Sequence, residues 1–439
     1  MAYVVVPAIF CPWAAFAAPH AWGQIKIDQP PIDYFQAEMH DAVADLQRRL
    51  DQGQASLRWD EQFGWLPALL EAFKISPTSQ TLVFSKTSLQ ISHIAPETPR
   101  ALYFNDDVYV GSVQHGDLIE VSAVDPQRGA VFYSLPQRKT ARVQFTRDQG
   151  QCLTCHQAQR TQGVPGYLVR SLFTAPSGQP LLNLGGENVD ATTPFVKRFG
   201  GWYVTGEHGT MRHRGNAPAP ADLASPRDFD VEAGANVVDL TARLDTSFYL
   251  TPHSDLVAQM TLEHQTQMHN AITLAAFTAL DAQRYDAMWN KILDRPEDHV
   301  SEVSQRRLAD ACENLVRHLL FCNEYRLDAP ISGSSQFAAD FPEQGPRDSQ
   351  GRSLRDFDLQ RRLFKHPCSY LIYCDSIASL PSSMKSLLYL RLHEVLAGDD
   401  ASRAYSHLSA DDRLAIREIL NDTHPTFREA SSQANGSAP

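Results

Sequence analysis

The sequence predicts an α+β protein with a strand- and loop-rich middle region and a mainly helical C-terminal half. Two patterns favour this fold. From Thr81 to about Leu250, short runs of β-branched and aromatic residues alternate with turn residues. After about His253, apolar residues recur at the three- and four-residue spacing of helices. The two regions can be drawn as separate domains or as one α+β unit, and the sequence leaves both open.

The expected strands are short runs separated by turn residues. Asn105-Asp106-Asp107, His115-Gly116-Asp117 and Asp125-Pro126 carry side chains typical of tight turns. The runs between such turns are expected to be strands, at residues 82–84, 101–104, 108–110, 118–121 and 131–133.

Helices are expected on both sides of this region. Apolar spacing predicts N-terminal helices over 32–50 and 65–73. Ser254 or Asp255 can cap a helix that runs to about Leu280. Later helical patterns cover 303–325, 382–396 and 410–420, and a loop is expected at 329–351.

The expected organisation has four parts. A signal peptide at 1–18 precedes a mixed, strand-rich region at 30–252, which carries the motif described below. A helical region at 253–427 and a small, polar tail at 428–439, expected to be disordered, follow.

The signal-peptide prediction rests on an apolar stretch over 3–18 that ends near Ala15-Phe16-Ala17, a small-x-small sequence. The usual basic start is missing, because no Lys or Arg precedes Lys26. A misplaced start or an apolar N-terminal strand are the alternatives. The stretch is short for a membrane span, and no other segment reaches that length, so no integral membrane segment is expected in the mature chain.

The composition narrows the possible partners. The 439-residue chain has 43% hydrophobic and 21% charged residues and a formal net charge of −12. Basic residues are scattered and form no concentrated patch of the kind that phosphate backbones require. Nucleic-acid binding is therefore not expected, and a basic partner protein fits the charge better.

One motif carries specific chemistry. Cys152-Leu153-Thr154-Cys155-His156 is a C-x-x-C-H sequence, the attachment pattern of c-type haem. The two thiols reach the two vinyl groups on one edge of the porphyrin, and the adjacent His156 is delivered to the iron as the proximal ligand. Since the motif occurs once, one covalent haem c is expected.

The residues after the motif agree with this assignment. Gly163-Val164-Pro165-Gly166 is typical of a loop, and such a loop can present a backbone carbonyl to Nδ1–H of His156. Two other interpretations stay open. A zinc site would need a second closely spaced Cys/His pair, which is absent nearby, and a thioredoxin-like pair would need a βαβ unit.

The remaining cysteines are ambiguous. Cys11 would be lost with a signal peptide. Cys312 and Cys322 follow a helical stripe and are expected to be buried thiols, which would lie about 15 Å apart on one helix. A disulfide from this helix to Cys368 or Cys374 is possible in an exported protein, but the sequence does not select a pairing.

Two clusters offer candidates for the sixth iron ligand. The first lies in a glycine-flanked loop at 206–216 and contains His208, Met211 and His213. The alternative is that these are solvent-facing loop residues. Arg212 and Arg214 in the same loop could pair with haem propionates or simply be solvated.

The second cluster lies on the helix expected after residue 253. His264 shares a helical stripe with Met260 and Met268, and His269 follows directly. An imidazole on an apolar face is typical of a distal haem pocket. It is also typical of a hydrogen-bonded core histidine, so both interpretations stay open.

At the C-L-T-C-H motif the chain resembles c-type cytochromes. Longer runs resemble an uncharacterised family of large exported bacterial haem c proteins, and this resemblance implies haem and export but no reaction. These runs are PRALYFNDDVYVG (99–111), GGWYVTGEHG (200–209), LEHQTQMHN (262–270) and SLRDFDL (353–359). The fold of small class I cytochromes is not implied. Their motif lies near the start of a domain of about 100 residues, whereas in this chain it lies at 152–156, deep inside a much larger protein.

The sequence therefore predicts an exported, periplasmic single-haem cytochrome c that transfers electrons to a redox partner protein. The alternative is a haem c enzyme with an open distal site, acting as a peroxidase- or oxygenase-like oxidoreductase. Its motivation is the large amount of protein around a single haem. A third possibility is a haem-free, zinc-stabilised binding protein.

Overall fold

A computed structural model describes residues 25–400 and 402–436 of the chain. The predicted signal peptide at 1–18 and Cys11 lie outside these residues. Within them, no helix combines the length and apolar character needed to cross a membrane.

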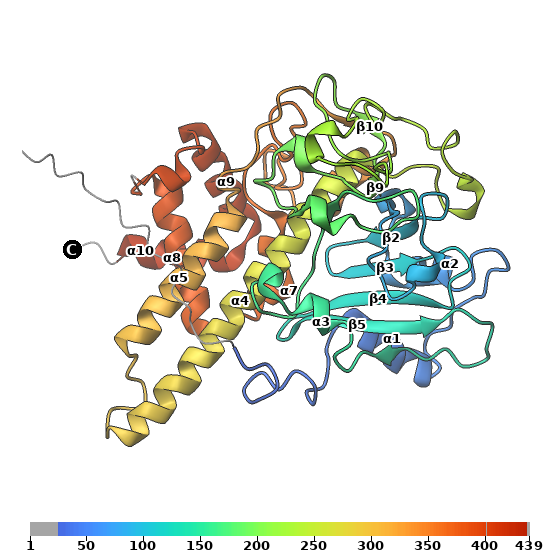
Figure 1. Ribbon diagram of the computed structural model, residues 1–439. Helices are drawn as coiled ribbons and strands as arrows, with labels where there is room; N and C mark the ends of the chain where they lie inside the picture. The colour runs from blue at the N-terminus through green and yellow to red at the C-terminus, as the bar shows by residue number, and fades with distance from the viewer. Residues whose placement is uncertain (1–24, 401, 437–439) are drawn as a thin grey trace, which may run out of the picture.

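The middle region forms an antiparallel seven-stranded sheet with the strand order β6-β5-β4-β3-β2-β1-β9 (Figure 1). All five predicted strands are present. The strands are β1 (Thr81–Val83), β2 (Arg100–Phe104), β3 (Val108–Ser112), β4 (Leu118–Asp125), β5 (Gly129–Pro136), β6 (Thr146–Arg147) and β9 (Trp202–Tyr203).

The predicted turn residues form the hairpins. Between β2 and β3, Asn105 Oδ1 accepts hydrogen bonds from the backbone N–H groups of Asp107 and Val108. Between β4 and β5, Asp125 Oδ1 accepts from the N–H groups of Gln127 and Arg128. These side chains satisfy backbone donors that the strands cannot reach, which fixes where each strand ends.

The sheet buries both of its faces. On one face, Val121 and Val131 pack with the helices α1 (Ala42–Asp51) and α2 (Leu66–Phe73). The predicted helix at 32–50 is correct only from Ala42, because Asp41 caps α1 and the residues before it form turns.

The opposite face packs against α4 (Leu256–Ile292), which separates the sheet from the C-terminal helices (Figure 1). Asp255, one of the two residues expected to cap this helix, is its N-cap, but the helix continues 12 residues past the expected end at Leu280. Its residues are buried almost all round as far as Ala279, because protein covers it on every side.

The C-terminal half is helical, and its larger helices are α5 (Glu302–Leu319), α8 (Ser382–Ala397), α9 (Ala410–Thr423) and α10 (Pro425–Gly436). Two boundaries differ from the expectation. Because α5 ends at Leu319, Cys322 lies beyond it. The expected disordered tail is helical over 428–436, because α10 continues through these residues. The buried Phe427 in the first turn of α10 stacks on His393 at a centroid distance of 4.0 Å and fixes the start of the helix.

Shorter elements connect these parts. They are α3 (Leu153–His156), α6 (Phe337–Asp340), α7 (Asp375–Ala378), β7 (Arg170–Leu172), β8 (Gly186–Asn188), β10 (Gly206–Glu207) and β11 (Ser332–Gly333). The start of α4 falls close to the expected boundary between 30–252 and 253–427. One continuous apolar core nevertheless contains side chains from both regions, including Phe132 of the sheet and Leu392 of α8.

The cap of α4 is a testable point of stability. Asp255 is fully buried; its Oδ1 accepts from Val257 N and Ala258 N, and its Oδ2 accepts from Ser335 N at 2.8 Å and Ser335 Oγ at 2.9 Å. Asp255→Ala is expected to lower the free energy of unfolding by about 2–4 kcal/mol, because it removes a cap and strands buried donors. Chemical denaturation measures this loss.

Ser301→Ala is the matched control, since Ser301 caps α5 at a partly exposed position. It is expected to cost about 1 kcal/mol. Equal losses in the two variants would contradict the special role given to Asp255.

Candidate haem-attachment site

The C-x-x-C-H motif forms a single helical turn, α3, beside strand β5. Asp148 prepares this turn: its N–H donates to Phe132 O at 2.8 Å, and its Oδ2 accepts from Gly150 N and Cys152 N. The motif is therefore tied to the sheet at its first residue. This link depends on the Asp148 side chain, which accepts from two backbone N–H groups before the motif, and on the Asp148 N–H, which donates to β5. The sequence feature that indicates it is the Asp-x-Gly spacing at 148–150.

The two cysteines of the motif are positioned for different surroundings. Cys152 is half-buried and Cys155 is exposed, and no disulfide joins any of the six described cysteines. Since they stand three residues apart on a helical turn, their side chains share one side of it. Burial and the neighbouring Asp148 raise the pKa of the Cys152 thiol to about 12, so it is a thiol rather than a thiolate at neutral pH.

His156 is held by two reciprocal hydrogen bonds to Gly166. Its Nδ1 lies 2.9 Å from Gly166 O, and Gly166 N donates to His156 O at 2.9 Å. The carbonyl acceptor that the sequence predicts in the 163–166 loop is therefore present. Because a carbonyl only accepts, the proton sits on Nδ1 and the lone pair on Nε2. Burial lowers the pKa of His156, which favours this neutral form.

Asn270 of α4 fixes the loop that holds His156. Its Oδ1 accepts from Tyr167 N at 2.8 Å and its Nδ2 donates to Tyr167 O at 2.9 Å. A Cβ at position 166 would lie 2.1 Å from Asn270 Oδ1, so only glycine fits there. Sequence reasoning did not single out Asn270. Its only signal was its place at the end of the LEHQTQMHN run.

The sheet side of the site is aromatic and charged. Phe132 of β5 packs against the His156 ring at a centroid distance of 4.7 Å. Arg100 of β2 and Glu120 of β4 form an ion pair at 2.6 Å, with side chains that are only 18% and 15% exposed. Neither residue was predicted as part of the site.

The first group of distal candidates gathers in one buried cluster. The rings of His208 and His213 lie 4.7 Å apart, and both pack against Phe195. His208 uses both nitrogens, since Nδ1 donates to Met211 O and Nε2 accepts from Asn236 N. His213 Nδ1 accepts from Gly215 N, and its Nε2 is buried with no hydrogen-bond partner in the described part of the chain.

The arginines of this loop have partners of their own. Arg212 pairs with Glu232 at 2.7 Å, and Arg214 lies over the Phe173 ring at 4.5 Å. Each arginine therefore already has a favourable partner in the protein, and neither position requires a haem propionate to explain it.

The histidines of α4 are buried and neutral. His264 stacks on Phe321 at 4.2 Å, and its Nε2 lies 2.8 Å from Ser369 Oγ. His269 Nε2 donates to Asp106 O at 2.8 Å, which leaves Nδ1 as a lone pair that meets no hydrogen-bonding group among the described residues. Burial lowers the pKa of His264 to about 3 and that of His269 to about 4.

The site that these contacts define joins the motif to Phe132, Gly166 and Asn270. The hydrogen-bonding and ring partners of the His156 side chain among the described residues are Gly166 and Phe132. None of His208, Met211, His213 or His264 is among them. The described residues also contain no group of three or more His, Cys, Asp or Glu side chains arranged to hold a metal ion.

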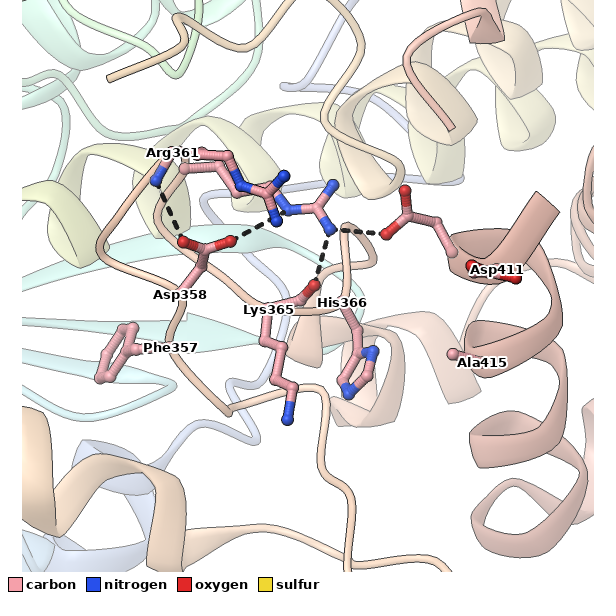
Figure 2. Close-up of a pocket in the computed structure, with 9 residues that line it drawn as sticks. Phe357, Asp358, Arg361, Lys365, His366, Asp411 and Ala415 are labelled. Carbon is pink, nitrogen blue, oxygen red and sulfur yellow. Dashed lines mark hydrogen bonds and ion pairs between the residues drawn. The ribbon is translucent and has the colours of Figure 1, made fainter. Parts of the chain in front are cut away.

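A separate pocket of about 530 Å³ lies in the C-terminal half (Figure 2). Its charged lining consists of three cations, Arg361, Arg362 and Lys365, and three carboxylates, Asp358, Asp411 and Asp412. Positive and negative side chains are equally represented around it. The pocket therefore shows no preference for an ion of one sign.

Comparison with known proteins identifies no relative: no family model, curated protein or solved structure matches the chain. The assignment of the site depends on its own residues and geometry.

The buried His264 predicts a pH-dependent stability. Because its pKa is about 3 in the folded protein and about 6.5 when unfolded, the unfolded chain takes up the proton first as pH falls. Between about pH 7 and about pH 5, His264 is expected to cost the protein about 2 kcal/mol of its free energy of unfolding. His264→Phe should remove this part of the loss in denaturation curves at the two pH values.

The exposed His299 provides the control, since His299→Gln should leave the pH dependence unchanged. If His264→Phe is as acid-sensitive as the wild type, the histidine is not held neutral in the fold.

Proposed function

We propose that the chain is an exported single-haem c-type cytochrome that transfers electrons. Haem c is attached through Cys152 and Cys155, and His156 is the proximal ligand. The observation that carries this proposal is the hydrogen bond from His156 Nδ1 to Gly166 O, because it leaves Nε2 available beside two reduced thiols.

The residues present fit covalent haem better than the alternatives for a C-x-x-C pair. A thioredoxin-like pair needs an activated thiolate, whereas the pKa of Cys152 is raised. A zinc site needs further ligands, and the described residues offer no such group. The zinc-stabilised binding protein therefore gains no support.

Haem c bound here would supply a one-electron redox centre. The chain's own residues prepare it: Gly166 orients the imidazole, Asn270 holds Gly166 in place, and Phe132 supports the ring on the sheet side. Exposed Cys155 places one attachment point at the surface, where a partner protein can approach.

The partner and the compartment follow from the cofactor and the charge. Haem c is attached outside the cytoplasm in bacteria, so the proposal includes export to the periplasm. The net charge of −12 favours a basic redox partner, which long-range attraction would steer towards the acidic chain.

A second candidate function has a specific observation in its favour. Both ring nitrogens of His208 and Nε2 of His264 are hydrogen-bonded, so none of these three nitrogens can bind iron without losing a hydrogen bond. An iron that keeps an open distal position can bind and activate small molecules. The alternative is therefore a haem c oxidoreductase of the peroxidase or oxygenase type.

The proposed attachment has a direct test. The full chain, expressed with a cytochrome c maturation system and purified under denaturing conditions, should carry the mass of one haem and show a haem absorption band. Cys152→Ser together with Cys155→Ser should remove the covalent haem completely, because no thioether can form. Intact mass spectrometry measures both results.

Cys312→Ser is the matched control, since Cys312 is a buried thiol outside the motif, and it should keep full haem loading. His156→Ala should retain covalent haem at lower yield with an altered spectrum. Wild-type protein without covalent haem would refute the proposed function.

Carbon monoxide separates the two candidate functions. The electron-transfer proposal expects a six-coordinate iron, so the spectrum of the reduced protein should not change with carbon monoxide. Met211→Ala, His213→Ala or His264→Ala should then create carbon monoxide binding in whichever variant removes the distal ligand. A wild-type protein that binds carbon monoxide directly would instead support the enzyme.

A further inference from the structure

The face of the sheet that carries the motif also carries a buried ion pair. Four neighbouring strands place one row of paired residues on this face: Leu102, Gly111, Glu120 and Ser134. Residues two positions apart on a strand point to the same face. Arg100, two residues from Leu102, and Phe132, two residues from Ser134, therefore point to this face as well. Phe132 lies two residues from Ser134 on β5, so Glu120 and the ring that supports His156 are diagonal neighbours.

Gly111 makes room for this pair. A Cβ at position 111 would lie 2.5 Å from a terminal nitrogen of Arg100 and 2.7 Å from its Nε. The guanidinium therefore lies across β3 and reaches Glu120 on β4 at 2.6 Å. Ser88 Oγ donates to Glu120 Oε1 at 2.7 Å, which fixes the carboxylate from its other side.

Arg100 keeps unused donor capacity. A guanidinium has five N–H donors, and Arg100 Nε is buried with no acceptor among the residues that the structure describes. A buried donor without a partner costs free energy, and an anion placed there would recover it. Haem carries two propionate carboxylates, which are the anionic groups that arginine pairs with most strongly.

The surroundings suit a mainly apolar ligand with a charged edge. Leu89 and Ile91 are 47% and 50% exposed and flank Gln90, whose amide donates to Leu118 O on β4. This segment is held at β4, because Ser88 is hydrogen-bonded to Glu120 and Gln90 to Leu118.

We propose that Arg100, laid across Gly111 and held by Glu120, is the haem-positioning arginine of this protein. Its guanidinium takes a propionate of the haem c attached at Cys152 and Cys155, and the Arg100–Glu120 pair sets the electrostatic field at the iron. This inference rests on the proposed function, and it assigns no role to Arg212 or Arg214.

The test is the midpoint potential of the haem-carrying full chain, measured by spectroelectrochemical titration. Arg100→Met should lower the potential, because the loss of a nearby cation stabilises the oxidised iron. Glu120→Gln should raise it, because an anion is lost. Gly111→Ala should lower it without any change of charge, because the new Cβ displaces the guanidinium.

Arg306→Met is the matched control, since it also removes one positive charge, from an exposed pair with Glu302 on α5, and it should leave the potential unchanged. A purely structural role for Arg100 would not give shifts of opposite sign in Arg100→Met and Glu120→Gln. If Arg100→Met does not fold, Glu120→Gln and Gly111→Ala decide the question by the same signs.

The failures of the two proposals can be told apart. Wild-type protein that lacks covalent haem overturns both. Haem-loaded protein whose potential is the same in the wild type, Glu120→Gln and Gly111→Ala overturns the role of Arg100 and leaves the proposed function in place.

Discussion

The geometry of the candidate site depends on one interaction, the paired hydrogen bonds of Asn270 with the backbone of Tyr167. These bonds fix Gly166 beside α4, and Gly166 in turn orients the imidazole of His156. All the groups involved are buried or half-buried, so water does not substitute for a lost partner. Removing the amide of Asn270 would leave a buried N–H and a buried C=O unsatisfied and release the loop.

Local signals made much of the fold predictable. The strands follow from alternation and from Asx turns such as those of Asn105 and Asp125, and the start of α4 follows from the cap at Asp255. The acceptor for His156 was also predictable, because the Gly163-Val164-Pro165-Gly166 loop follows the motif closely and its backbone carbonyls are not committed to a helix or a strand. The helical tail was missed because a polar composition hid the anchoring role of Phe427.

The remainder of the site depends on register and on contacts distant in sequence. That Arg100 meets Glu120 follows only once β2, β3 and β4 are aligned, since a shift of one residue would turn these side chains to the other face. The space that Gly111 leaves for the Arg100 guanidinium cannot be predicted without that alignment. His208, Met211 and His213 were correctly grouped by sequence, yet only the fold shows that their cluster is built on Phe195 and on backbone partners.

The polar character of α4 explains why the two halves of the chain share one core. Gln265 donates to Asn105 O and to the Tyr109 hydroxyl, His269 donates to Asp106 O, and Asn270 binds Tyr167. These bonds join the helix to the turn after β2, to strand β3 and to the loop at Tyr167. A fully apolar helix would pack as tightly but would leave those turn carbonyls unpaired in the interior. The buried polar residues of α4 therefore fix the position of the sheet, and with it Phe132 and the charged pair, relative to the loop that holds His156.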